Sequence, residues 1–93
     1  MMIQQKDNGK RGEFYLEIDT KIMASMTYSY AGEDKIIIDH TDVDESLKGQ
    51  GVGYKLVEAS VDFARKNNIK IMPLCPFANS VFKKRSEYKD VLL

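Results

Sequence analysis

Hydrophobic and polar residues alternate through the first 40 residues of the chain, as they do in half-buried strands. Over positions 13–19 and again over 21–30, every second side chain is apolar. A period of two places alternate side chains on opposite faces of a strand, so both segments are predicted to be strands. Short turn-prone segments rich in Gly, Asp and Asn separate them from their neighbours. The predicted strands are residues 2–6, 13–19, 21–30 and 35–40, and the last three form an antiparallel meander.

After residue 51 the apolar residues recur at helical spacing. They form a wide apolar face that includes Val52, Leu56, Ala59 and Phe63. A strand over 69–74 follows this helix and is expected to lie parallel to the strand at 35–40, or close to it, because a helix connects the two. Residues 77–85 predict a short second helix, and residues 86–93 predict an ordered tail or a short strand. The fold class is therefore α/β (α+β), a mixed sheet in one domain over residues 1–93.

The composition is that of an ordinary globular protein without a net charge. Its 93 residues are 43% hydrophobic and 30% charged, and 14 basic residues balance 14 acidic ones. This balance creates no global field for nucleic acid or an anionic membrane, so neither is expected as a partner. The one cysteine cannot form an internal disulfide, and no Cys/His cluster has metal-ligand spacing, so no metal is expected. The amino terminus lacks the apolar run of a secretion signal, which favours the cytoplasm.

Three of the six glycines stand at alternate positions directly before the long predicted helix, at Gly49, Gly51 and Gly53. Backbone N–H groups in a helix's first turn lack internal partners and lie at the positive end of its dipole. Glycines there allow close approach and positive φ, so the segment predicts a phosphate or pyrophosphate site. A plain turn without a ligand is the alternative.

Two familiar phosphate-binding loops do not fit this spacing. A dinucleotide fingerprint starting at Gly49 would need glycine at position 54, where Tyr54 stands. A P-loop would need Gly-Lys-Ser/Thr, which the segment also lacks.

The glycine segment resembles the coenzyme A loop of the GCN5-related N-acetyltransferases; it reads Lys48-Gly49-Gln50-Gly51-Val52-Gly53. The signature of that loop is Arg or Gln, two variable residues, Gly, one variable residue, then Gly or Ala. Lys48 departs from the usual Arg or Gln. The order of strands, loop and helix over about residues 13–85 is also similar to that family's core. The resemblance implies acetyl-CoA binding by these six residues, and Asn79 is similar to an asparagine that often opens the family's last helix. It also implies two parallel strands that splay apart to admit the pantetheine arm, a separation that Pro73 and Pro76 would favour because proline lacks an N–H.

The chain is short for this family and resembles its minimal subgroup, which has a cysteine near the active site. The residues that carry this likeness are His40-Thr41 and Pro73-Leu74-Cys75-Pro76. The length leaves no room for the amino-terminal helices that often wall the acceptor site. A second copy of the chain could complete that wall, which makes a homodimer one expectation.

Cys75 and His40 are the candidate catalytic residues. A lone cysteine is usually a small buried hydrophobic residue, but the resemblance implies that Cys75 lies beside the thioester, where it could take the acetyl group or only line the pocket. His40 could act as a base near neutral pH. Strand alternation puts His40 on the face of Ile36 and Ile38, so a structural histidine is the alternative. Tyr88 is a weaker candidate for a general acid.

The resemblance implies an acetyl-CoA-dependent N-acetyltransferase acting on a primary amine, with the acceptor (a small molecule or a protein amino group) unidentified. A non-catalytic module that binds acetyl-CoA or a partner protein is the main alternative. A structural domain with a ligand-free glycine turn is a third. Acidic residues within 31–47 could attract a cationic amine, and Lys83, Lys84 and Arg85 could meet the 3′-phosphate. For both clusters an ordinary solvated charged face is the favoured interpretation.

Overall fold

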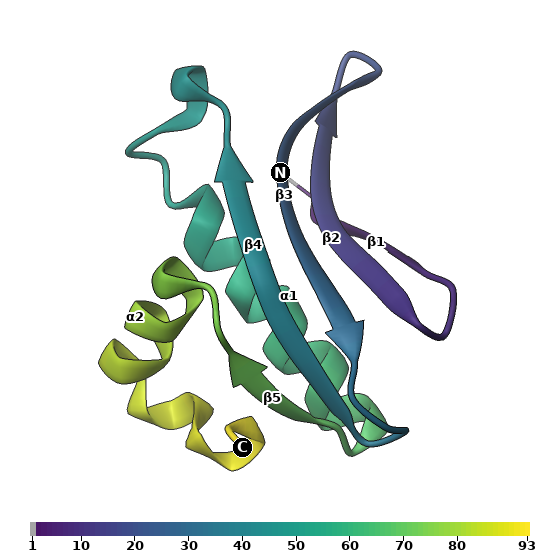
Figure 1. The fold of residues 1–93 in the computed structure, drawn as a ribbon. Coiled ribbons are helices and arrows are strands. Elements are labelled where there is room, and N and C mark those ends of the chain that lie inside the picture. The colour runs from purple at the N-terminus through teal and green to yellow at the C-terminus, as the bar shows by residue number, and fades with distance from the viewer. Residues whose placement is uncertain (1) are drawn as a thin grey trace.

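A five-stranded mixed sheet forms the centre of the molecule, as the sequence predicts (Figure 1). The computed structural model describes residues 2–93. The strands lie in the order of the sequence, with β1 to β4 antiparallel and β5 parallel to β4. They are β1 (Gln4–Asp7), β2 (Arg11–Ile18), β3 (Lys21–Tyr30), β4 (Lys35–Val43) and β5 (Lys70–Pro73).

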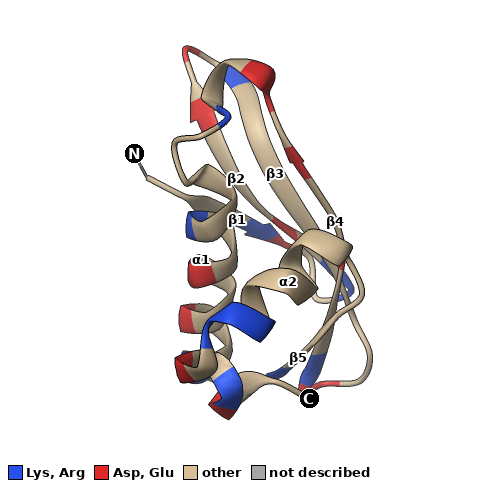
Figure 2. Cartoon of the chain, turned by 90° about the vertical axis from the view of Figure 1, so that its left-hand side faces the viewer, with Lys and Arg blue, Asp and Glu red and all other residues tan. Residues whose placement is uncertain are grey.

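Two α-helices follow the two parallel strands. The crossover helix α1 (Val52–Asn67) connects β4 to β5, and α2 (Pro76–Lys84) follows β5. Seen from the side, α1 covers one face of the sheet and α2 lies near β5 (Figure 2). Two short 3-10 segments, η1 (Glu45–Leu47) and η2 (Ser86–Val91), precede α1 and follow α2. None of the helices in residues 2–93 combines the length and apolarity needed to cross a membrane.

The core lies between α1 and the inner face of the sheet. Alternate residues of β2, β3 and β4 face α1, and Met26, Tyr28 and Ile36 are fully buried there. From α1, Leu56 and Val61 are equally inaccessible. Each such side chain stabilises the fold by about 1.5–3 kcal/mol through burial alone. Among the described residues no helix covers the other face of the sheet, which we call the open face (Figure 2).

A β-bulge in β4 changes which side chains face the core. Thr27 pairs with His40 and Tyr28 pairs with Ile38, so Asp39 is an extra residue without a partner across the ladder. Asp39 lies on the open face, where its carboxylate accepts hydrogen bonds from the hydroxyls of Thr27 (2.5 Å) and Ser29 (3.0 Å).

The bulge makes one sequence expectation wrong. Regular alternation would place His40 on the inner face with Ile36 and Ile38, but the extra residue moves His40 to the open face, where it is exposed. Thr41 takes the inner position and pairs with the buried Met26. A one-residue shift exchanges the two faces of a strand, because side chains alternate with a period of two.

The parallel strands separate after a short ladder. Pairing between β4 and β5 ends at Ile38 and Pro73, whereas β4 continues to Val43. The amides of Leu74 and Cys75 both donate to the carbonyl oxygen of Ile38, each at 3.0 Å, so the chain turns away from β4 at this point. Proline supplies no N–H to extend the ladder. The splayed strands expected from the resemblance are therefore present.

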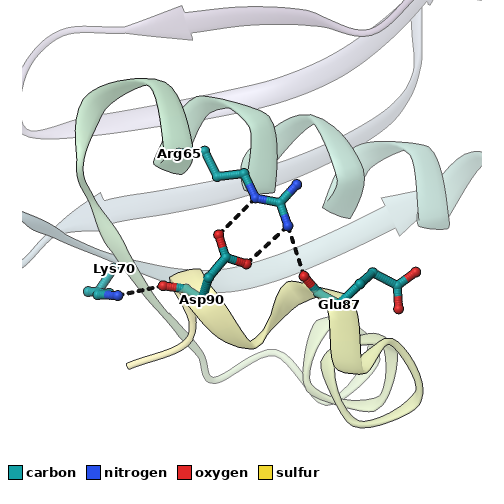
Figure 3. Close-up of polar contacts among 4 residues, drawn as sticks. All are labelled: Arg65, Lys70, Glu87 and Asp90. Carbon is teal, nitrogen blue, oxygen red and sulfur yellow. Dashed lines mark hydrogen bonds and ion pairs between the residues drawn. The ribbon is translucent and has the colours of Figure 1, made fainter.

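The C-terminal segment is ordered and tied to the rest of the chain, as predicted. The guanidinium of Arg65 donates to both carboxylate oxygens of Asp90 (2.9 and 3.0 Å) and to the carbonyl of Glu87 (2.8 Å) (Figure 3). The amide of Leu93 donates to Ile71 in β5 at 2.9 Å. Beneath these polar contacts Val91 is buried. The segment thus closes the end of the core beside α1 and β5.

Candidate functional site

A groove of about 530 Å³ lies where β4 leaves β5 and α1 begins. Its walls come from three places along the chain: the end of β4, the loop with the first turn of α1, and the start of α2. More of its lining is apolar than polar. The lining residues are Thr41, Val43, Leu47, Lys48, Gly49, Gly51, Val52, Gly53, Tyr54 and Phe77.

The three glycines of the loop meet different physical requirements. Gly49 and Gly51 have φ values of 82° and 75°, in the left-handed region where a Cβ is unfavourable. No atom lies within 4 Å of the place where their Cβ atoms would stand, so the backbone is open to a ligand. Gly53 instead makes room for α2, because a Cβ there would lie 2.5 Å from the ring of Phe77.

The first turn of α1 is suited to an anion. Gly51 is the N-cap and has no side chain to bond the free amides, and the first turn contains no acidic residue. The Lys48 ammonium lies 3.1 Å from the Glu45 carboxylate. The Gln50 side-chain amide donates to the carbonyl of Ser46 at 3.4 Å. All of the predicted residues 48–53 except Gln50 therefore line one wall of the groove.

Cys75 lies at the separation of the two strands, as the N-cap of α2. It is only 5% exposed, and its Sγ lies 3.3 Å from the hydroxyl oxygen of Thr41. Asn79, one turn later, donates from its side-chain amide to the carbonyl of Pro73 at 3.3 Å. Asn79 thus ties the start of α2 to the end of β5, and Thr41 connects Cys75 to the groove that it lines.

His40 does not join this cluster on the inner face. Its side chain lies on the open face across from Thr27, whereas Cys75 meets Thr41 on the groove side. The two candidate catalytic residues therefore flank the strand separation from opposite faces of the sheet. Within residues 2–93 no group of three or more His, Cys, Asp or Glu side chains is arranged to hold a metal ion.

A second, smaller hollow of about 270 Å³ adjoins the loop, and Gly51 and Tyr54 line both this hollow and the groove. The Arg85 guanidinium lies 5.3 Å from the centre of the Tyr54 ring, and the Lys84 ammonium lies 3.4 Å from the Tyr54 hydroxyl. Tyr88 lines this hollow rather than the groove. Burial, followed by the charge of Glu58, raises the pKa of Tyr88.

Sequence reasoning named the loop but missed several residues that line the groove. Tyr54 and Phe77 pack edge to face with their ring centres 5.8 Å apart and form one side of it. Gly53 was the available signal, because a glycine inside a helical pattern costs stability and can have a packing reason. The position of Thr41 depends on the bulge, for which the sequence carries no clear signal.

These features define a class of protein. A meander, a parallel pair that splays open, and a glycine loop leading into the crossover helix form the arrangement that the resemblance to the GCN5-related N-acetyltransferases implies. The model of the GCN5-related N-acetyl-transferase family matches residues 13–91, and the chain belongs to this family.

Individual relatives agree with this assignment. The chain is 24% identical to Protein NATD1 of Xenopus tropicalis over 82 residues, which cover 87% of this chain and 75% of that one. The solution structure of a GCN5-like protein from Staphylococcus aureus is 41% identical, has a TM-score of 0.78, and is matched over 99% of this chain and 87% of that one. A predicted acetyltransferase from Clostridium acetobutylicum, crystallised with acetyl-CoA, shares the fold with a TM-score of 0.65 at 21% identity. The match covers 80% of this chain and 55% of that chain.

Proposed function

We propose that this chain binds acetyl-CoA and transfers its acetyl group to a primary amine. The observation that carries the proposal is the open backbone at Gly49 and Gly51, next to the uncapped start of α1 and beside the strand separation. Family membership supports the same chemistry, and a structural neighbour has been crystallised with acetyl-CoA.

In this proposal each part of the groove receives one part of the coenzyme. The pyrophosphate meets the amides of Gly49 to Gly53, where the helix dipole and the absence of acidic residues favour negative charge. The pantetheine arm lies along the apolar wall formed by Val52 and Phe77. Lys48 lines the groove, Gln50 lines the smaller adjoining hollow, and Asn79 holds the start of α2 against Pro73. The acetyl group reaches the strand separation near Cys75.

The reaction itself has two routes. In direct transfer, the amine nitrogen bonds to the acetyl carbon, the carbon–sulfur bond to the coenzyme breaks, and the proton shed by the amine leaves through a base. In the covalent route, Cys75 Sγ first takes the acetyl group and the coenzyme leaves as its thiol, after which the amine displaces the sulfur. His40 is the base in either route. It takes the proton from an amine acceptor that approaches from the open face.

A second candidate function is a binding module that holds acetyl-CoA without catalysis. It is favoured by the position of the two candidate residues, since Cys75 is only 5% exposed and His40 lies on the other face of the sheet. A groove without an assembled acid–base pair can bind a ligand without accelerating a reaction.

Coenzyme binding is tested by titrating the protein with acetyl-CoA while following backbone amide shifts. We expect the largest shifts from Gly49 to Tyr54. Gly51→Ala should weaken binding at least about tenfold, because the new Cβ occupies the space above the loop. Gly9→Ala is the matched control: Gly9 also has positive φ (86°) with no atom near its Cβ position, but it lies in the turn between β1 and β2. Equal binding by the two variants would refute the loop assignment.

Catalysis is tested by amine-dependent release of the free coenzyme thiol. Release above the spontaneous rate with any member of an amine panel separates the enzyme from the binding module.

The covalent route is tested by the intact mass of the protein after incubation with acetyl-CoA alone. The parent protein should gain one acetyl group, and Cys75→Ala should gain none. His40→Gln should lower amine-dependent release and leave coenzyme binding unchanged. Binding without release by any amine would favour the module.

A further inference from the structure

Within residues 2–93, the side chain that hydrogen-bonds to the Cys75 thiol comes from the bulged strand β4. Thr41 Oγ1 lies 3.3 Å from Cys75 Sγ, within the range of a hydrogen bond to sulfur. Thr41 reaches the inner face only because Asp39 is bulged out of the β4 ladder. Bulges next to functional sites often re-aim a side chain, and this one turns the Thr41 hydroxyl towards the strand separation.

Strand packing alone does not require a hydroxyl at position 41. The residue lies on the inner face, pairs with the fully buried Met26, and is followed two residues later by the apolar Val43. Valine has nearly the same shape as threonine and suits such a half-buried strand position. The side-chain hydroxyl makes its contact with Cys75, so its contribution is tied to the thiol.

The backbone around Cys75 leaves the thiol little freedom. The Cys75 amide donates to Ile38 at 3.0 Å, its carbonyl accepts the Asn79 amide at 2.9 Å, and Pro76 follows as the first residue of α2. With the backbone held in this way, side-chain rotation is the main remaining freedom. A hydroxyl 3.3 Å away selects among the rotamers of the thiol.

We propose that Thr41 is the positioning residue for Cys75. Its hydroxyl accepts from the resting thiol and holds it at the strand separation. When the thiol loses its proton, the same hydroxyl rotates and donates a hydrogen bond to the sulfur. Only attack of this thiolate on the acetyl group rests on the proposed function; the contact between the two side chains and its effect on the thiolate do not.

The first experiment reads the thiol without any coenzyme. Iodoacetamide forms a carbon–sulfur bond with the Cys75 thiolate, iodide leaves, and the thiol proton passes to water. Because the chain contains one cysteine, the mass increase of the folded protein reports this residue alone. Thr41→Val should react about tenfold more slowly, since the thiolate is the reactive form and loses its hydrogen bond. Thr41→Ser keeps the hydroxyl and should stay within about threefold of the parent rate.

Three outcomes would overturn the proposal. An unchanged or faster rate in Thr41→Val means that the hydroxyl does not stabilise the thiolate. An equal loss in Thr41→Ser means that the methyl group, not the hydroxyl, is responsible. If Thr41→Val does not fold, Thr41→Ala is compared with Val43→Ala, a similar loss of volume on the same face of β4. Equal rates in that pair overturn the proposal as well.

The second experiment separates this inference from the proposed function. With acetyl-CoA and an active amine, Thr41→Val should lower kcat about tenfold while KM for the coenzyme stays within about twofold, because the positioning acts on the reacting sulfur. If the parent protein does not bind acetyl-CoA, the proposed function fails and the alkylation rates still decide the role of Thr41. If the coenzyme binds but Thr41→Val alkylates at the parent rate, the role of Thr41 fails and the proposed function stands.

Discussion

At the scale of single residues, glycines that look alike in the sequence are required for different reasons. Gly51 is needed for a positive φ and an open approach, whereas Gly53 is needed for the close packing of α2. This difference changes what a substitution does. At Gly51 an added Cβ strains the backbone, and at Gly53 it meets the far end of a half-buried aromatic ring.

Gly53→Ala should destabilise the protein by about 1 kcal/mol. The new Cβ would lie 2.5 Å from the Phe77 ring and force it to move, which outweighs the gain from replacing glycine inside a helix. In a Phe77→Leu background the ring is absent, so Gly53→Ala should instead stabilise by about 0.5–1 kcal/mol. Urea unfolding of the four proteins forms a double-mutant cycle. The same sign in both backgrounds would contradict the assignment of Gly53 to packing.

At the scale of elements, β1 is attached to the sheet through a hydrogen-bonded carboxylate. Asp7 accepts from the hydroxyls of Tyr28 (2.6 Å) and Tyr30 (2.7 Å), and Gln5 donates to the Tyr28 oxygen at 2.8 Å. Partial burial acts to raise the pKa of Asp7, but the hydrogen bonds from Tyr28, Tyr30 and the Gly9 amide outweigh it, and the pKa is below its ordinary value.

Asp7→Asn should therefore lower stability near neutral pH and have little effect in acid. A carboxyl whose pKa is depressed by folding stabilises the fold above the unfolded value of about 3.9, and this stabilisation is lost as the pH falls through the folded value. The urea midpoint of the parent should fall more steeply than that of Asp7→Asn below about pH 4. Asp42→Asn, which removes an exposed carboxylate from the open face, is the control. Parallel curves for the parent and Asp7→Asn would contradict the role of Asp7.

The other short element, η2, is held by burial more than by its ion pair. Val91 is 3% exposed, whereas both Arg65 and Asp90 side chains are about half exposed at 43% and 54%. Exposed ion pairs contribute little because water and salt screen them. Val91→Ala should destabilise by about 2 kcal/mol. Arg65→Lys, which keeps the charge but loses the two-pronged contact, should move the urea midpoint much less. The reverse order would show that the polar tether dominates.

The sequence predicted elements better than it predicted faces. Every strand and both α-helices were predicted. Alternation identifies β2 and β3 and helical spacing identifies α1, because those patterns reflect burial directly. The glycine loop was also recognisable, since its spacing is local. His40 was assigned to the wrong face because one unpaired residue, Asp39, reverses the alternation after it. A bulge depends on how two strands twist against each other, and nothing in the residues of β4 alone indicates it.

At the scale of the whole molecule, a single core connects sheet and helices, while charges are spread over the surface. Acidic and basic residues are interspersed, with a basic last turn in α2 (Figure 2). With 14 residues of each sign, the chain exerts no strong long-range field on an anionic coenzyme. Recognition in the proposed function therefore depends on the local geometry of the loop and groove.

The same architecture predicts a gradient of local stability across the sheet. Strands β3 and β4 have neighbours on both sides and bury alternate residues under α1, whereas β1 is an edge strand whose four residues are all exposed. Local opening needs least energy where few apolar contacts break. Native-state hydrogen exchange should therefore protect amides of β3 and β4 most and those of β1 least. Asp7→Asn should speed exchange in β1 alone, because its side chain joins that strand to Tyr28 and Tyr30. Equal protection in β1 and β3, or a uniform effect of Asp7→Asn, would mean that the sheet opens only as one unit.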